Sequence, residues 1–269
     1  MTPEEMERRV LYRDGLILVI DKPAGHAVHR GPKGGSSLED HFDALRFGLP
    51  RAPALAHRLD RDTSGCLVLG RHRKALAHLG LLFKHGRIGK TYWAVVEGGP
   101  AADEGRIDLA LGRLDATRGW WMKPDPDGLP AATAWQVLGR GRRPLAAEGD
   151  TAGTLAWLAL TPLTGRTHQL RVHSAAMGCP IVGDAIYGTA PRSGGPPLHL
   201  HAREVVVPLS RNREPVRVVA PVPAHMRELM APCGWVEDAG PLIGPLIGVR
   251  PLFPITGDFE QNSSGLDGK

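Results

Sequence analysis

The sequence contains few cysteines and few aromatic residues. Its 269 residues include three cysteines, and 5% of the residues are aromatic. Cys66, Cys179 and Cys233 lie far apart, without a CxxC pair or the spacing of a zinc site. This pattern excludes a disulfide-stapled scaffold and a zinc ribbon. It predicts a reducing, cytoplasmic setting.

Long hydrophobic runs are also missing. The first residues, from Met1 to Arg9, are charged and lack the apolar stretch of a signal peptide. No segment approaches the roughly 18 consecutive apolar residues that a membrane-spanning helix needs. We therefore expect no signal peptide and no membrane partner.

The excess of positive charge lies in the residues before Val236. Lys and Arg number 33 against 28 Asp and Glu, which gives a net charge of +5 and a pI near 9.4. From Val236 onward two basic residues stand against five acidic ones, so this segment carries −3 and the residues before it carry +8. Such a body suits a polyanionic partner.

Strand and helix patterns are interleaved along the chain, and 42% of the residues are hydrophobic, which is enough for a large core. The expected strands cover residues 10–12, 16–20, 66–69, 91–96, 132–138, 154–160, 198–202, 205–207 and 216–220. The expected helices follow a capping box of Ser36 and Glu39, and cover residues 73–85, 166–177 and 223–230. Residues 99–131, rich in Gly, Pro and Asp, are expected to form outward loops. Because strands and helices do not alternate strictly, the pattern favours an α+β fold.

Charge is densest in residues 57–65, which read His-Arg-Leu-Asp-Arg-Asp-Thr-Ser-Gly between two apolar segments. This composition suits the edge of a cleft better than a hydrophobic interior. In an extended chain Arg58 shares a face with Asp60, and Arg61 follows directly. Nearby cations keep a carboxylate ionised, so Asp60 is a candidate nucleophile, general base or metal ligand. A surface Asp–Arg pair that orders a turn is an equally open interpretation, and Asp62 suits that structural role better.

Two further candidates lie downstream. Arg171, on a predicted helix, would present its guanidinium to a carboxylate or phosphate, although a solvated helix face is the alternative. Tyr92 begins a predicted strand after a basic loop; a base stacked on such a ring gains about 1–3 kcal/mol, and core packing is the alternative. His168 and His173 are five residues apart, not the four that bring two ligands together on a helix. We therefore predict no metal site.

Five motifs occur in the order typical of one known family. They are Asp-Lys-Pro-Ala-Gly at 21–25, His-Arg-Leu-Asp-x-x-Thr-Ser-Gly at 57–65, Lys-x-Tyr at 90–92, Gly-Arg-Thr-His-Gln-Leu-Arg-Val-His at 165–173, and Pro-Ile-Val-Gly-Asp at 180–184. Tyr187-Gly188 follows the last motif, and Leu200-His201-Ala202 is similar to a late strand of the family. Together they resemble the RluA-type pseudouridine synthases over roughly residues 10–230.

The resemblance implies the pseudouridine synthase fold: a central, mainly antiparallel or mixed sheet in two halves, flanked by helices, with the catalytic cleft between them. It also implies an RNA uridine isomerase without cofactor or metal. In that reaction the glycosidic bond is cut, the uracil turns, and a carbon–carbon bond forms to the same sugar. The substrates implied are specific uridines in structured RNA, either ribosomal RNA, transfer RNA or both.

The family likeness also implies roles for single residues. Asp60 would be the nucleophile, attacking base or sugar, and Arg171 its salt-bridge partner. Tyr92 would stack on the target base, and Arg58 would hold the RNA open after the nucleotide is flipped out. We expect two departures from the family: the absence of an N-terminal extension that would hold a small S4-like RNA-binding domain, and, in residues 128–133, the absence of the basic residue that often precedes the Ala-x-Thr segment.

We therefore expect residues 1–235 to form the catalytic domain and residues 236–269 a Pro- and Gly-rich acidic tail. The expected protein is a cytoplasmic monomer whose partner is RNA. Two alternatives remain open. A catalytically inactive RNA-binding relative would not need Asp60, and a carboxylate-dependent nucleoside or glycoside hydrolase would release free uracil.

Overall fold

The computed structural model describes residues 1–31, 34–115, 120–144, 153–210 and 212–237. Residues Met1–Val236 form one compact unit. The expected tail, residues 236–269, lies almost wholly outside the described residues. Every helix in the described part of the chain is too short or too polar to span a bilayer.

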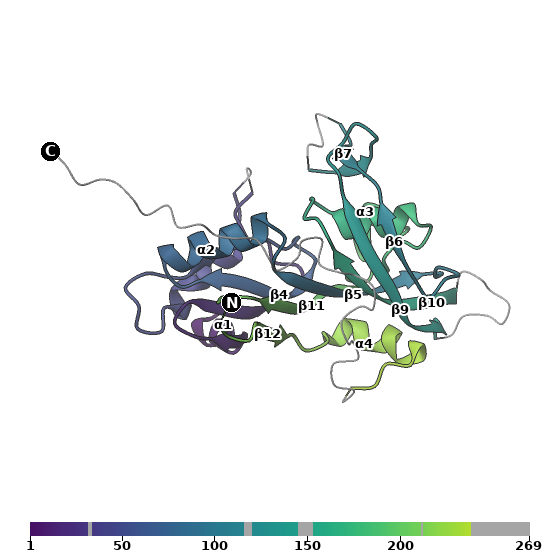
Figure 1. Ribbon diagram of the computed structural model, residues 1–269. Helices are drawn as coiled ribbons and strands as arrows, with labels where there is room; N and C mark the ends of the chain where they lie inside the picture. The colour runs from purple at the N-terminus through teal and green to yellow at the C-terminus, as the bar shows by residue number, and fades with distance from the viewer. Residues whose placement is uncertain (32–33, 116–119, 145–152, 211, 238–269) are drawn as a thin grey trace. The chain divides into compact units, whose positions relative to one another are not determined.

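Ten of the described strands form a single sheet (Figure 1). Its main path runs β1-β2-β4-β11-β5-β10-β9-β6, with β3 paired to β4 and β12 paired to β11. The strands are β1 (Val10–Arg13), β2 (Ile17–Lys22), β3 (Ala54–Leu55), β4 (Ser64–Gly70), β5 (Gly89–Glu97), β6 (Glu104–Asp108), β9 (Ala132–Arg142), β10 (Thr154–Pro162), β11 (Leu200–Val207) and β12 (Val216–Val219). The pair β4–β11 is parallel and the other pairs are antiparallel. The predicted α+β fold with a mainly antiparallel sheet is therefore confirmed.

Helices pack on both halves of the sheet; the first half contains β2 and β4, and the second half contains β5, β10 and β9. They are α1 (Pro3–Glu7), the 3₁₀ helix η1 (Leu38–Leu45), α2 (Arg73–Lys84), α3 (Gln169–Ala176), α4 (Ala224–Met230) and the 3₁₀ turn η3 (Ala231–Cys233). In the first half, β2 alternates: Leu18 and Ile20 pack with α1 and η1, whereas Ile17 and Val19 pack on the α2 side. In the second half, Leu170 of α3 packs against β5 and β10. Each half therefore has its own packed core.

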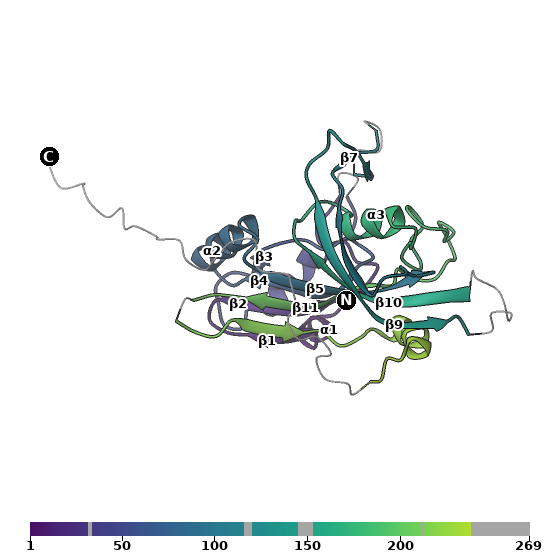
Figure 2. The same ribbon diagram turned by 45° about the vertical axis from the view of Figure 1, so that its right-hand side comes forward.

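A separate hairpin of β7 (Leu111–Arg113) and β8 (Met122–Pro124) projects from the second half of the sheet (Figures 1 and 2). It falls in residues 99–131, where outward loops are expected from the Gly, Pro and Asp content. That segment also contains β6, which pairs with β9 at the sheet edge. The prediction of loops was therefore incomplete.

Gly65 brings β4 and β11 together. Its φ is +103°, and a Cβ built on it would lie 2.3 Å from the carbonyl oxygen of Ala202. A side chain at this position would therefore clash with the neighbouring backbone. Next to it, the Ser64 hydroxyl lies 2.9 Å from Nδ1 of His201 in β11. The Thr-Ser-Gly end of the charged motif is thus built into the one parallel strand pair among the described strands.

Two helix starts differ from the predictions. The capping box is formed by Ser37 and Asp40 instead of Ser36 and Glu39, and it opens a 3₁₀ helix. Helix α3 begins at Gln169, three residues later than expected, because His168 has a left-handed backbone (φ 53°, ψ 16°) that stops helical hydrogen bonding before it.

Candidate active site

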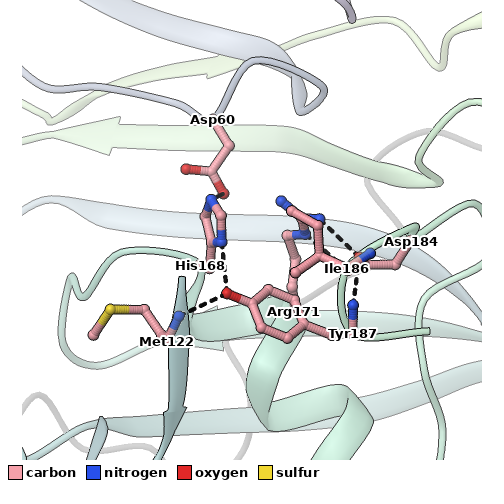
Figure 3. A network of polar contacts seen from close by, with 7 residues as sticks. All are labelled: Asp60, Met122, His168, Arg171, Asp184, Ile186 and Tyr187. Carbon is pink, nitrogen blue, oxygen red and sulfur yellow. Dashed lines mark hydrogen bonds and ion pairs between the residues drawn. The ribbon is translucent and has the colours of Figure 1, made fainter. Parts of the chain in front are cut away.

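Asp60 lies in the irregular segment between β3 and β4, facing residues of α3 and of the loop after it (Figure 3). Its neighbour Leu59 is buried in the core of the first half and anchors the segment. The Asp60 backbone carbonyl accepts a hydrogen bond from the Thr63 N–H at 3.2 Å. The side chain keeps 21% of its surface exposed. A carboxylate held in this way remains accessible to a reactant.

Lys22, the last residue of β2, ties this segment to the sheet. Its ammonium donates three hydrogen bonds of 2.8 Å, to the carbonyls of Pro23, Arg61 and Thr63. The side chain is fully buried, and burial lowers its pKa to about 7, against the opposing charges of Asp62 and Asp60. The three donors of one ammonium are thus matched by three backbone acceptors, two of them in the segment that carries Asp60.

A chain of polar contacts leads from Asp60 to the β7–β8 hairpin (Figure 3). Nε2 of His168 lies 3.9 Å from Oδ2 of Asp60. On the other side of the ring, Nδ1 lies 2.8 Å from the Tyr187 hydroxyl. That hydroxyl accepts the N–H of Met122 in β8 at 2.9 Å. Burial lowers the pKa of His168, so the imidazole next to Asp60 is neutral near pH 7.

The expected ion pair between Arg171 and Asp60 is absent among the residues that the structure describes. Arg171 instead donates two hydrogen bonds of 2.7 Å to the carboxylate of Asp184. Both side chains are buried, and the geometry is the bidentate one that favours an arginine. Although burial opposes ionisation, the guanidinium holds the pKa of Asp184 below its usual range. The positive charge of Arg171 still acts on Asp60 at longer range.

Tyr92 lies in β5, half-buried between the cores of the two halves. Burial raises the pKa of its hydroxyl, and the negative charge of Asp60 raises it further. The phenol therefore stays protonated next to the carboxylate. Tyr92 and Arg171 therefore both interact electrostatically with Asp60, while their roles toward a substrate stay predictions.

Three further arginines lie in the motifs at 57–65 and 165–173. Arg58 is exposed, and its charge acts on the nearby His168. Arg61 is 72% exposed and donates from Nε to the Gly25 carbonyl at 3.1 Å. Arg166 donates from Nε to the Pro130 carbonyl at 3.0 Å, so a guanidinium lies beside the segment that lacks a basic residue of its own.

The hairpin places an exposed aromatic side chain beside the site. Trp120 is 57% exposed, and its ring centroid lies 5.6 Å from that of His168 in an edge-on contact. Its other aromatic neighbour is Trp121, at 5.5 Å, over which the Arg192 guanidinium lies at 5.2 Å. A large exposed indole suits a stacking base.

No group of three or more His, Cys, Asp or Glu side chains in the described residues is arranged to hold a metal ion. His173 lies away from His168: its ring bonds to the Thr133 hydroxyl at 2.9 Å and the Leu109 carbonyl at 3.0 Å. Asp184 is 1% exposed and committed to Arg171. It is therefore not available as the second acid of a hydrolase.

Five residues of the site were given no role in the reaction from sequence. Lys22, Asp184 and Tyr187 lie in or beside the motifs, where their presence alone was a signal. His168 was considered as a metal ligand and set aside. Trp120 lies outside the motifs, and the Gly- and Pro-rich sequence around it gave no sign that it lies near Asp60.

Comparisons with known proteins identify the family of this chain. A family model described as RNA pseudouridylate synthase matches residues 16–176. An uncharacterized RNA pseudouridine synthase of Zymomonas mobilis is 39% identical over 226 residues, covering 83% of this chain and 98% of the relative. The ribosomal large subunit pseudouridine synthase C of Vibrio cholerae is 33% identical over 237 residues, covering 84% of this chain and 69% of the relative.

Two solved human structures have a similar fold. RNA pseudouridylate synthase domain containing 4 superposes with a TM-score of 0.68 at 26% identity, covering 86% of this chain and 95% of its own. RNA pseudouridylate synthase domain containing 1 gives a TM-score of 0.65 at 29% identity, covering 82% and 85%. These likenesses extend over most of the compact unit.

Proposed function

Because the chain belongs to the RNA pseudouridylate synthase family, whose members are isomerases that convert uridine in RNA to pseudouridine, we propose that Asp60 is its nucleophile and that large-subunit ribosomal RNA is its substrate. In the net reaction the N1–C1′ bond breaks, a C5–C1′ bond forms, and one proton passes from C5 to N1. No atom is gained or lost. Asp60 makes a transient bond to the nucleotide while the uracil turns.

The observation that carries this proposal is the setting of Asp60. The carboxylate is partly exposed, and its segment is tied down by the buried ammonium of Lys22. The other carboxylate of the network, Asp184, is neutralised by Arg171 and buried. Of these two acids, Asp60 is therefore the one that can approach a substrate as a free anion.

The choice of RNA is supported by charge and by the similarity to a relative named for the large ribosomal subunit. The residues before Val236 carry +8. Contacts between basic side chains and phosphates contribute much of the affinity of proteins for nucleic acids. Flipping a nucleotide out of its stack costs a few kcal/mol. Arg58, Tyr92 and Trp120 would offset that cost by holding the opened RNA and stacking on bases.

The test measures isomerisation directly. Because the C5 hydrogen leaves the base, a transcript of large-subunit ribosomal RNA made with 5-³H uridine releases tritium to water as pseudouridine forms. Wild-type protein should release it, while Asp60→Asn should bind the transcript equally well and release none. Near-normal turnover by Asp60→Asn would reject the nucleophile. Activity on a transfer RNA transcript but not on the ribosomal one would reject the substrate.

A further inference from the structure

The hydrogen bonds around His168 indicate which of its ring nitrogens carries the proton. The Tyr187 oxygen already accepts the N–H of Met122 at 2.9 Å. The hydroxyl has one proton of its own to donate, and Nδ1 of His168 lies 2.8 Å away. Donation from Tyr187 requires an unprotonated Nδ1. In a neutral imidazole the proton then resides on Nε2.

The opposite side of the ring supports the same tautomer. Nε2 faces Oδ2 of Asp60 at 3.9 Å (Figure 3). A lone pair on Nε2 would be repelled by the carboxylate, whereas an N–H is attracted to it. The ring is buried, with 8% of the side chain exposed, so little water screens this contact. Two independent neighbours, a hydroxyl and a carboxylate, therefore select one tautomer.

The His168 ring is held in this place by an energetically unfavourable backbone conformation. His168 is one of two non-glycine residues with positive φ among the described residues. Such conformations persist where the surroundings over-determine them, and they gather at functional sites. Here the left-handed residue places the imidazole between Asp60 and Tyr187 immediately before α3 begins. A helical backbone at His168 would direct the side chain elsewhere.

From this arrangement we propose that His168 is a positioning residue for Asp60. Its neutral Nε2–H closes on Oδ2 when the uridine is seated, which leaves Oδ1 to bond with the nucleotide. Contacts of this kind are commonly long in a free site and shorten when substrate binds. The inference rests on the proposed role of Asp60 as nucleophile. It adds a link through Tyr187 to the backbone of the β7–β8 hairpin.

Several other charges act on the same two groups. The charged and titratable groups facing His168 are Asp60, Arg58, Arg171, Asp184 and the Tyr187 hydroxyl. Those acting with Asp60 include Lys22, Tyr92 and Arg171. These neighbours can also change the pH–rate profile. A change in that profile is therefore assigned to His168 only if the His168 and Tyr187 variants distinguish its effect from theirs.

Kinetics on the tritiated ribosomal transcript provide the first test. His168→Leu removes the donor, and kcat should fall about 10- to 100-fold, the effect of losing one hydrogen bond to a charged group. KM should stay within twofold, and the acid limb of the pH–rate profile should move to higher pH. His168→Gln keeps an N–H for Asp60 and an oxygen for Tyr187, so it should recover most of the lost rate.

Tyr187→Phe is the second variant. It leaves His168 in place but removes the hydroxyl that selects its tautomer, so kcat should fall by less than in His168→Leu. An unchanged rate and pH profile in His168→Leu, while Asp60→Asn is inactive, would overturn this inference and leave the nucleophile standing. Activity in Asp60→Asn would instead reject the proposed function.

The tautomer is measured on the wild-type protein without RNA. With ¹⁵N-labelled histidine, the two ring nitrogens of His168 have distinct chemical shifts, and the His168→Gln spectrum assigns them. At pH 7 we expect a protonated Nε2 and an unprotonated Nδ1 in the wild type. In Tyr187→Phe we expect the Nδ1–H tautomer or a mixture of the two tautomers. Observation of Nδ1–H in the wild type would reject the proposal even if His168→Leu failed to fold.

Discussion

Arg171 and Asp184 form a closed, bidentate ion pair in which both hydrogen bonds measure 2.7 Å. The Asp184 carboxylate also accepts the backbone N–H groups of Ile186 and Tyr187, at 2.9 and 3.0 Å. The Arg171 guanidinium lies 5.2 Å from the centre of the Tyr187 ring. The pair therefore fixes the turn that carries the Tyr187 hydroxyl toward His168.

Breaking this pair from one side should be costly. Asp184→Asn leaves the Arg171 charge buried without its anion, which typically destabilises by about 3–5 kcal/mol. Urea unfolding measures the loss. Asp127→Asn is the matched control, because Asp127 lies on an exposed turn. The control should change the free energy of unfolding by less than about 0.5 kcal/mol. Equal effects of the two variants would contradict the structural role of the pair.

The close approach of β4 and β11 predicts that Gly65→Ala is strongly destabilising. A Cβ there meets the Ala202 carbonyl oxygen at 2.3 Å, in addition to the penalty for a φ of +103°. Gly178 has a φ of +80° with open space around it, so Gly178→Ala isolates the backbone penalty of about 1–2 kcal/mol. Gly65→Ala should lose at least about 1–3 kcal/mol more. Similar unfolding midpoints for both would show that β11 moves aside freely.

Local sequence patterns predicted most of the strands, because alternation and apolar runs record burial directly. The Leu16–Ile20 run appears as β2, and Cys66–Leu69 lies inside the fully buried β4. The order of the motifs likewise indicated the family and the Asp60 segment. Patterns of this kind depend on neighbours within a few residues.

Local sequence patterns could not identify the ion-pair partner of Arg171, because that partner is decided by distances in the folded chain. Asp60 and Asp184 both belong to motifs, and sequence spacing does not say which carboxylate the guanidinium reaches. The left-handed backbone of His168 was similarly hidden, because a histidine before a helical pattern is read as part of the helix. Trp120 approaches His168 only because the β7–β8 hairpin folds back toward α3, a tertiary contact.

Lys22 should contribute to both catalysis and stability. Lys22→Met removes the three hydrogen bonds that hold the carbonyls of Pro23, Arg61 and Thr63, but it also removes the cost of burying an ammonium. We expect a loss of about 1–3 kcal/mol in unfolding free energy. Because the segment bearing Asp60 loses its tie, kcat for tritium release should fall more than about tenfold. Lys84→Met, at the exposed end of α2, is the control; a Lys22→Met enzyme as fast as this control would refute the positioning role.

Stability should fall as the solution becomes acidic. Burial lowers the pKa of His57 and His201 to about 3 and that of His199 to about 4, so the folded chain binds fewer protons than the unfolded chain below about pH 6.5. Burial raises the pKa of Asp21 to about 6, which offsets one of these protons between about pH 4 and 6.

For these four groups the net difference of about two protons corresponds to a loss of roughly 2.7 kcal/mol per pH unit between pH 6 and 4.5, and the lowered pKa values of His168, His173 and His225 add to this loss. Urea unfolding at closely spaced pH values gives the slope directly. His199→Gln removes one titrating group and should reduce the slope by about 1.4 kcal/mol per unit. A stability that stays flat, or rises, on acidification from pH 6 would contradict the neutrality of these buried rings.

Trp120 and Arg58 should contribute to RNA binding in two distinguishable ways. Loss of a stacked base in Trp120→Ala should weaken binding of the ribosomal transcript by about 1–3 kcal/mol at every salt concentration. Arg58→Gln removes the RNA contact that we propose for this guanidinium, so it should lower the slope of log K against log salt by about one. Binding titrations at several salt concentrations measure both quantities on the same RNA. Because Trp120 is uncharged, its variant should keep the wild-type slope. A changed slope in Trp120→Ala would contradict a pure stacking role for Trp120, and an unchanged slope in Arg58→Gln would contradict a phosphate contact of Arg58.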